Sequence, residues 1–255
     1  MTKTMAKLAD VMFVLDTTGS MRNAIEAVKN VIGQLADIYS EASIETRLGI
    51  IQFRDRVLTH GQDEGTNRTL ERAQFDEGDF TQDPNEFRDV LAFYKAAGGG
   101  PLPESSMDAL AHAAESAWRE EATRIIIHIT DAPPRVPDYR MREMEEVTNL
   151  LSRNHIGQLH MVIDSEFMEQ YDDLVEVKTD GIGGNQYATV TWVELRQDVE
   201  DIIEDLRDIA RTSSEIIGFS PTPSVERAAE ENPFESEPDN AGEAAKGDVN
   251  PFDLE

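Results

Sequence analysis

Short apolar runs alternate with amphipathic segments along the chain up to about residue 218. Each run is rich in β-branched and other large apolar side chains and is bounded by polar residues. Unbroken apolar runs of this length are typical of strands that are covered on both faces, as in a parallel sheet. The pattern predicts strands at 11–15, 48–53, 125–129 and 159–163, a weaker strand at 186–190 and a short edge strand at 57–60.

Helical periodicity fills the intervals between these runs. Ile25, Val28, Ile32, Leu35 and Ile38 recur at steps of three and four residues. This spacing predicts one buried stripe on a helix over residues 21–40. Further helices are predicted at 84–95, 104–121, 139–153, 166–177 and 194–212. The alternation of strands and helices predicts an α/β fold with a doubly wound, mostly parallel central sheet.

The apolar pattern stops near residue 218, so we predict a folded domain over 8–218 and a tail over 219–255. The tail holds five of the eleven prolines and ten acidic residues against two basic ones. A segment of this composition cannot bury enough apolar surface to offset its chain entropy, and we expect it to be disordered.

The tail contains the triplet Asn-Pro-Phe twice, at 232–234 and at 250–252, with acidic residues nearby. Asn-Pro favours a turn, after which the phenylalanine projects as an apolar anchor. We interpret these NPF motifs as short linear motifs that place Phe in a partner's pocket, and two copies would raise the apparent affinity. The alternative is an acidic tail that only adds solubility.

Composition limits the partners and the chemistry that the chain can have. The chain has 255 residues, 51 Asp and Glu against 23 Lys and Arg, and a formal net charge of −28. A field this negative repels phosphate, which argues against nucleic acid or an anionic membrane surface as a partner. The absence of cysteine excludes disulfides, thiol catalysis and Cys-ligated metals. No apolar run approaches a signal peptide or a membrane helix in length, and we expect a cytoplasmic protein.

Polar side chains leave the first predicted strand at alternate positions. Asp16, Thr18 and Ser20 can converge on one point, because alternate residues of an extended segment point the same way. Carboxylate and hydroxyl oxygens suit Mg²⁺. In the alternative interpretation, Ser20 caps the following helix and Asp16 accepts hydrogen bonds from loop amides.

Two further loops carry acidic residues to the same edge of the predicted sheet. Asp131 follows the strand at 125–129, and Glu104 follows three consecutive glycines at the start of a predicted helix. Glu104 could instead be an N-terminal acid favoured by the helix dipole, and Asp131 a strand-end cap. Ligands of open α/β sheets bind beyond the carboxyl ends of the strands. The three loops together therefore predict a site there.

The three motifs, in this order, resemble the von Willebrand factor type A (vWA) domain and its metal-ion-dependent adhesion site (MIDAS). They read DTTGSM, GGGPLPES and IIIHITDAPP, within a resemblance that covers about residues 8–212. The resemblance is strongest to the intracellular prokaryotic subtype with a DxTGSM motif, which also occurs beside alpha-kinase domains. It implies a Rossmann-like fold that binds Mg²⁺ or Mn²⁺ through Asp16, Thr18, Ser20 and Asp131. The family pattern has an Asp where this chain has Pro101, so we expect Glu104 to serve as the ligand from the second loop.

The same resemblance implies a non-enzymatic adaptor or scaffold. A protein partner would supply an acidic side chain that completes the coordination of the metal. The alternative is an enzyme, because Asp-Thr-Thr-Gly-Ser also resembles the nucleophile loop of haloacid-dehalogenase-type phosphatases, with Asp16 as nucleophile. That chemistry needs a second acid, or a lysine, close to the nucleophile, and Thr18 stands at the expected position.

Other polar residues are expected to have structural roles. His128 and His160 lie inside predicted strands, which indicates hydrogen-bonded core histidines. Arg54 and Asp55 follow the second strand and could border the site, although we favour a solvated loop.

Overall fold

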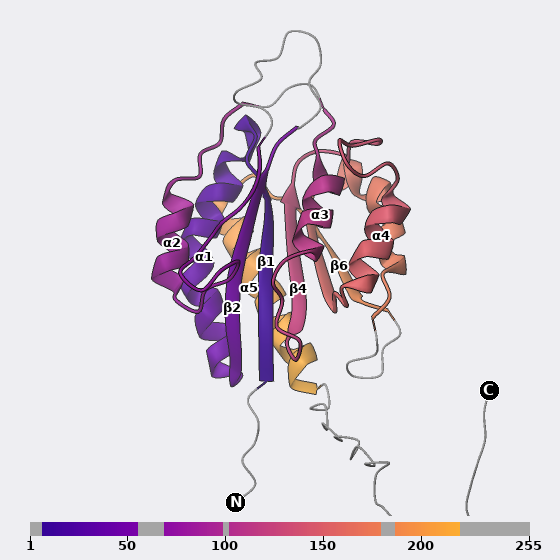
Figure 1. The fold of residues 1–255 in the computed structure, drawn as a ribbon. Helices are drawn as coiled ribbons and strands as arrows, with labels where there is room; N and C mark the ends of the chain where they lie inside the picture. The colour runs from indigo at the N-terminus through magenta and orange to yellow at the C-terminus, as the bar shows by residue number, and fades with distance from the viewer. Residues whose placement is uncertain (1–6, 56–68, 99–101, 180–186, 220–255) are drawn as a thin grey trace, which may run out of the picture. The chain divides into compact units, whose positions relative to one another are not determined.

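The computed structural model describes residues 7–55, 69–98, 102–179 and 187–219 (Figure 1). Six strands within this part of the chain form one sheet in the order β3-β2-β1-β4-β5-β6. Neighbouring strands are parallel except for β3, which pairs antiparallel with β2. The strands are β1 (Lys7–Asp16), β2 (Ile44–Phe53), β3 (Leu70–Arg72), β4 (Thr123–Thr130), β5 (Gln158–Ile163) and β6 (Thr189–Glu194).

Both faces of the sheet are covered, which explains the unbroken apolar runs. On β1, Phe13 and Leu15 belong to one core cluster, while Met12 and Val14 belong to the cluster on the opposite face. Both clusters are built from side chains of the same strands, so alternate positions on a strand serve different cores. The predicted α/β class with a doubly wound, mostly parallel sheet is confirmed.

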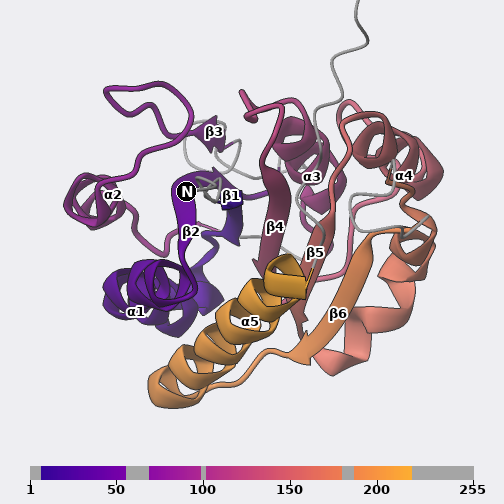
Figure 2. The ribbon, with the colours of Figure 1, turned by 90° about the horizontal axis from the view of Figure 1, so that it is seen from below.

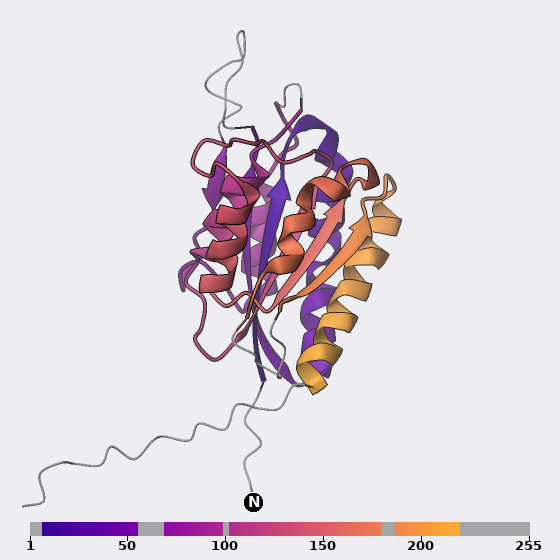
Figure 3. The ribbon, with the colours of Figure 1, turned by 90° about the vertical axis from the view of Figure 1, so that its right-hand side faces the viewer.

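Two layers of helices enclose the sheet (Figures 2 and 3). One face packs against α1 (Arg22–Glu41), α2 (Pro84–Ala92) and α5 (Val199–Phe219). The other face packs against α3 (Ser106–Ala114), α4 (Met144–Arg153) and the 3₁₀ helix η2 (Ser165–Glu176). A short 3₁₀ helix η1 (Gly19–Met21) precedes α1. None of the helices in the ranges given above is long and apolar enough to cross a membrane.

The amphipathic stripe predicted for 21–40 is confirmed. Ile25, Val28, Ile32 and Leu35 are buried in the core, and Ile38 packs against it half-buried. The other helix boundaries differ from the prediction. The segment predicted as a helix at 104–121 is helical only over α3, and the Trp118 indole donates to the carbonyl oxygens of Ala113 and Ala114, both at 3.1 Å.

Three more predicted elements are displaced or altered. Helix α4 begins five residues after 139, α5 begins five residues after 194, and the predicted helix at 166–177 is the 3₁₀ helix η2. The weak strand predicted at 186–190 is β6, which lies at Thr189–Glu194. The antiparallel strand β3 was missed. The predicted edge strand at 57–60 and the tail from 220 onward, with both NPF motifs, lie outside the described residues.

The order of the strands reverses between β1 and β4. From β1 the chain proceeds outward through β2 to β3 on one side, and from β4 through β5 to β6 on the other. The parallel strands all point toward the end of the sheet that lies at the top of Figure 1. A crevice beyond the carboxyl ends of the strands at such a reversal is where open α/β sheets bind ligands. Asp16 ends β1 and Thr130 ends β4, directly at this point.

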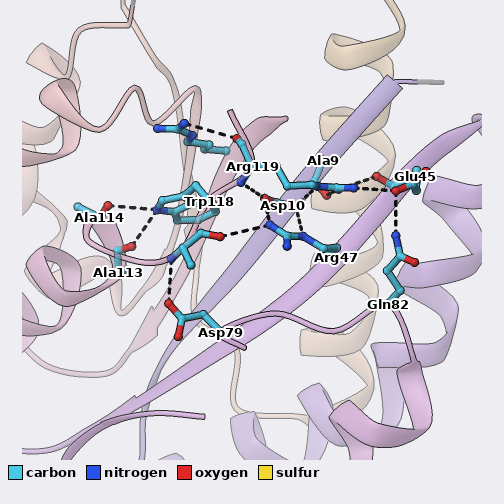
Figure 4. Close-up of polar contacts among 12 residues, drawn as sticks. Ala9, Asp10, Glu45, Arg47, Asp79, Gln82, Ala113, Ala114, Trp118 and Arg119 are labelled. Carbon is cyan, nitrogen blue, oxygen red and sulfur yellow. Dashed lines mark hydrogen bonds and ion pairs between the residues drawn. The ribbon is translucent and has the colours of Figure 1, made fainter. Parts of the chain in front are cut away.

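The opposite end of the sheet holds a buried carboxylate that is neutralised by two arginines (Figure 4). Asp10 is fully buried on β1 and accepts from Arg47 Nε at 2.9 Å and from Arg47 Nη2 at 2.6 Å. It also accepts from the backbone N–H of Arg119 at 2.7 Å and from Arg119 Nε at 2.9 Å. Arg119 reaches Glu45 as well, at 2.7 Å. The cluster joins β1, β2 and the segment that leads into β4.

Replacing Asp10 by asparagine is expected to lower the free energy of unfolding by more than about 2 kcal/mol. The substitution leaves two guanidinium groups beside an uncharged side chain, and breaking a buried ion pair costs roughly 3–5 kcal/mol when both partners are fully buried. Urea denaturation measures the change. Glu45→Gln is the control, because Glu45 is 50% exposed and an exposed pair contributes about 1 kcal/mol or less. Equal effects of the two substitutions would contradict this account.

Candidate metal centre

The first loop is a tight turn fixed by Asp16. The Asp16 side chain is 0% exposed, and its Oδ1 accepts from the backbone N–H of Thr18 at 2.8 Å. This turn brings the Thr18 and Ser20 hydroxyl oxygens within 3.4 Å of each other. Two hydroxyls therefore lie side by side at the start of η1.

A second hydrogen bond of the same carboxylate ties the ends of β1 and β4 together. Thr130 Oγ1 donates to Asp16 Oδ2 at 2.8 Å. Thr130 Oγ1 in turn accepts from the backbone N–H of Ala132 at 3.2 Å, which fixes the start of the loop that contains Asp131. Two of the three predicted loops are thus held in place by one buried acid.

The second loop packs directly on the first. The backbone N–H of Gly19 donates to the Gly98 carbonyl oxygen at 3.2 Å. A Cβ atom at position 19 would lie 3.2 Å from the same oxygen, so glycine permits this close approach. The backbone N–H of Ala97 donates to the Thr17 carbonyl oxygen at 3.1 Å, which adds a second link between the loops.

Glu104 places a buried carboxylate beside these loops. Its backbone N–H donates to the Pro133 carbonyl oxygen at 3.1 Å, and its own carbonyl oxygen accepts from Arg135 at 2.8 Å. The residue is 2% exposed, and its Oε2 has no hydrogen-bond partner among the residues that the structure describes. Burial and the nearby carboxylates of Asp16 and Asp55 raise the pKa of Glu104 to about 8.

A pocket of about 360 Å³ opens where the three loops meet. Four of the five predicted ligands line it: Thr18, Ser20, Glu104 and Asp131. The fifth, Asp16, is not among the lining residues, and both its oxygens accept hydrogen bonds. Burial raises the pKa of Asp16 to about 6. The structure therefore brings together the residues that the sequence placed on separate loops.

The donor set of the pocket fits a small hard cation. All of its candidate ligand atoms are hydroxyl or carboxylate oxygens, which suit Mg²⁺, and an unpartnered buried carboxylate oxygen is the kind of group that a cation stabilises. No cluster of three or more His, Asp and Glu side chains suited to a metal occurs within the described ranges. An ion here would therefore depend on the hydroxyls and on water in addition to the acids.

Several supporting residues were missed or misjudged from the sequence. The solvated loop that we favoured for Arg54 and Asp55 is wrong. Arg54 Nε donates to the Thr17 carbonyl oxygen at 3.0 Å, and Arg54 Nη2 donates to the Lys95 carbonyl oxygen at 3.1 Å. Asp55 is buried and accepts from Arg135 Nε at 2.9 Å and from Arg135 Nη2 at 2.6 Å. The only signal in the sequence was two charges directly after a buried strand.

A buried tyrosine supports the third loop from below. Tyr171 is fully buried, its hydroxyl donates to the Ala132 carbonyl oxygen at 3.0 Å, and the same hydroxyl lies 2.9 Å from Ser106 Oγ. His128 packs between Phe53 and Tyr171, with ring centroids 5.5 and 5.8 Å away. Burial lowers the pKa of His128 to about 3, so this histidine is a neutral core residue. The predicted core position of His128 is confirmed, but neither of its ring nitrogens has a hydrogen-bond partner among the described residues, whereas buried His160 lies within hydrogen-bond distance of Thr191 and Gln158.

An open α/β sheet with an oxygen-lined pocket at its topological switch point defines a Rossmann-like binding domain. Residues 11–133 match the family model described as von Willebrand factor type A domain, and they include all five candidate ligands. This part of the chain, a little under half of its length, is therefore similar to that family.

The proteins that are similar to the chain include a kinase and a solved structure. Alpha-protein kinase vwkA of Dictyostelium discoideum is 28% identical over 136 residues, which are 52% of this chain and 20% of that protein. The chain thus spans about a fifth of that relative. A solved structure, von Willebrand factor type A from Catenulispora acidiphila, aligns with 82% of this chain and 43% of its own, at 17% identity and a TM-score of 0.46.

The buried carboxylates predict an unusual dependence of stability on pH when divalent ions are chelated. Because the pKa of Glu104 is raised from 4.5 to about 8, the folded protein keeps a proton that the unfolded chain has released in this range. The free energy of unfolding then falls as pH rises from about 5 to 8. Thermal melts in EDTA should show a smaller loss of stability with rising pH for Glu104→Gln than for the wild type.

Exposed Glu121 provides the control for this measurement, since Glu121→Gln removes the same charge from the surface. That variant should keep the slope of the wild type. If Glu104→Gln and Glu121→Gln give the same slope, the pKa of Glu104 is not raised in the folded protein and the prediction is wrong.

Proposed function

We propose that the chain is a non-enzymatic protein-interaction module that depends on Mg²⁺ or Mn²⁺. Thr18, Ser20, Glu104 and Asp131 would hold the ion, as in a metal-ion-dependent adhesion site, and Asp16 would orient the loops that carry them. An acidic side chain of a protein partner would complete the site. The observation that carries the proposal is the buried, unpartnered Oε2 of Glu104 beside a pocket that Ser20 and Asp131 also line.

The electrostatics of the site support this proposal. A bound ion would add to the positive charge that Arg54 and Arg135 bring near Glu104, and it would offer a position for a further oxygen ligand. Helix α1 begins two residues after Ser20, and α3 begins two residues after Glu104. Helix N-termini favour an incoming anion. A chain with a net charge of −28 repels acidic partners at long range, so attraction has to be created locally.

The position of Asp16 weighs against the enzymatic alternative. A nucleophilic carboxylate needs a free oxygen that faces the substrate. Asp16 is fully buried, accepts hydrogen bonds through both oxygens and does not line the pocket. This arrangement favours an orienting role over attack on a phosphate.

Removing the Ser20 hydroxyl should weaken binding of the ion. Calorimetric titration of Mg²⁺ or Mn²⁺ into the full chain should show binding to the wild type. Ser20→Ala should bind the ion at least roughly tenfold more weakly. The loss follows because Ser20 Oγ is one of few uncharged oxygens in the pocket. Ser40→Ala, at the exposed far end of α1, is the matched control and should bind as the wild type does. Identical isotherms for Ser20→Ala and the wild type would remove the basis of the proposal.

The NPF motifs of the tail remain part of the proposed interaction function. The tail would present Phe234 and Phe252 to a second partner, independently of the ion. Deleting residues 219–255 should then remove a set of partners that EDTA does not affect. An unchanged set of partners would favour the solubilising role.

A further inference from the structure

A second pocket, of about 300 Å³, lies along the outer side of the start of α1. Three of its lining side chains are cationic and one is acidic. The lining residues are Arg22, Ile25, Glu26, Lys29, Tyr94, Lys95 and Ala96. Arg22, Glu26 and Lys29 are spaced by four and three residues, so they share one face of the helix.

The pocket gathers three cations in a strongly acidic chain. Acidic residues outnumber basic ones 51 to 23, and arginines such as Arg47, Arg119 and Arg135 are paired with buried carboxylates. Within the part of the chain described by the structure, Arg22 and Lys95 form no ion pair. The Lys29 ammonium donates to the Tyr94 carbonyl oxygen at 3.2 Å and also has no acidic partner there. Three basic groups that have no acidic partner among the described residues can together accept an external anion.

The basic pocket adjoins the candidate metal centre along both of its walls. On one wall, Arg22 follows Ser20 by two residues; on the other, Lys95 precedes Gly98 by three. The hydrogen bonds from Gly19 to Gly98 and from Ala97 to Thr17 hold these walls together. Two residues of chain span at most roughly 7 Å. Residues that line the two pockets are therefore close together in the chain on both walls.

We propose that the pocket lined by Arg22, Lys29 and Lys95 is a second docking subsite, which receives an acidic side chain of the same protein segment whose other carboxylate completes the metal centre. The inference rests on the proposed function of that centre. Alternate side chains of an extended segment point the same way and lie roughly 7 Å apart, which is also about the largest distance that the chain allows between Ser20 and Arg22. The preferred occupant is thus an extended segment with acidic residues at positions i and i+2.

Charge complementarity selects a short acidic peptide. A bound ion and the three cations of the pocket would offer positive charge to an incoming carboxylate, while the chain as a whole is strongly negative. A long polyanion such as a nucleic acid would extend beyond this surface, and the acidic residues of the chain would repel it. A segment with two carboxylates gains from both pockets and meets little repulsion.

The test compares peptides that differ in one charge. The probes are Gly-Glu-Ser-Glu-Gly, Gly-Glu-Ser-Gln-Gly and Gly-Gln-Ser-Glu-Gly, titrated into the full chain with Mn²⁺ or Mg²⁺ and followed by calorimetry or, with Mg²⁺, by NMR shifts. Exposed ion pairs each contribute modestly, so the peptide with two glutamates should bind about two- to fivefold more tightly than either of the others. The Arg22→Gln, Lys95→Gln double variant should lose this preference while its affinity for Mg²⁺ persists.

The control is the Arg153→Gln, Lys178→Gln double variant, which removes one arginine and one lysine that are exposed at the opposite end of the sheet. It should keep the preference. The proposal is overturned if the Arg22, Lys95 variant keeps the preference, if both variants lose it equally, or if the peptide with two glutamates does not bind. Failure of the metal centre itself has a different signature, namely that EDTA leaves peptide affinity unchanged.

Discussion

The candidate site depends on how a single buried carboxylate, that of Asp16, is hydrogen-bonded. One oxygen accepts from the Thr18 backbone and forms the turn that aligns the Thr18 and Ser20 hydroxyls. The other accepts from Thr130 and joins the ends of β1 and β4, where the order of the strands reverses. Both donors are uncharged, so the negative charge is positioned without being neutralised. Burial under these conditions raises the pKa of Asp16 to about 6.

The buried acids at the two ends of the sheet have different hydrogen-bond donors around them. Asp10, at the amino end, accepts hydrogen bonds from two guanidinium groups. At the carboxyl end, Asp16 accepts only from an amide and a hydroxyl in the contacts given above, and Glu104 keeps an oxygen with no hydrogen-bond partner among the described residues. The first arrangement stabilises a fold, because the positive charge belongs to the protein. The second leaves a buried carboxylate oxygen without a hydrogen-bond donor among the described residues, which is why we propose that a cation binds at this end.

Much of the fold could be predicted because buried parallel strands leave an unbroken apolar run in the sequence. The run at 11–15 located β1 but missed its beginning at Lys7, since Asp10 looked like a polar boundary. Asp10 is tolerated inside the strand only because Arg47 and Arg119 reach it from positions 37 and 109 residues away. Pairings over such distances leave no local pattern, and the same holds for Asp55 with Arg135.

The candidate site was predictable to the extent that topology dictates it. Polar residues that follow parallel strands meet at one edge, and Thr18, Ser20, Glu104 and Asp131 do line one pocket. The sequence could not show that Asp16 is covered by its own turn, or that Arg54 braces that turn through Thr17. It also could not show the basic pocket beside the site, because Lys95 and Arg22 come together only through the packing of one loop against α1.

The most direct test of the central claim is a crystallographic anomalous difference map of the protein soaked in millimolar Mn²⁺. The account predicts one strong peak in the pocket, within coordination distance of Ser20 Oγ and of a carboxylate oxygen of Glu104 or Asp131. A map with no peak among these oxygens, or with the only peak elsewhere on the acidic surface, would contradict it.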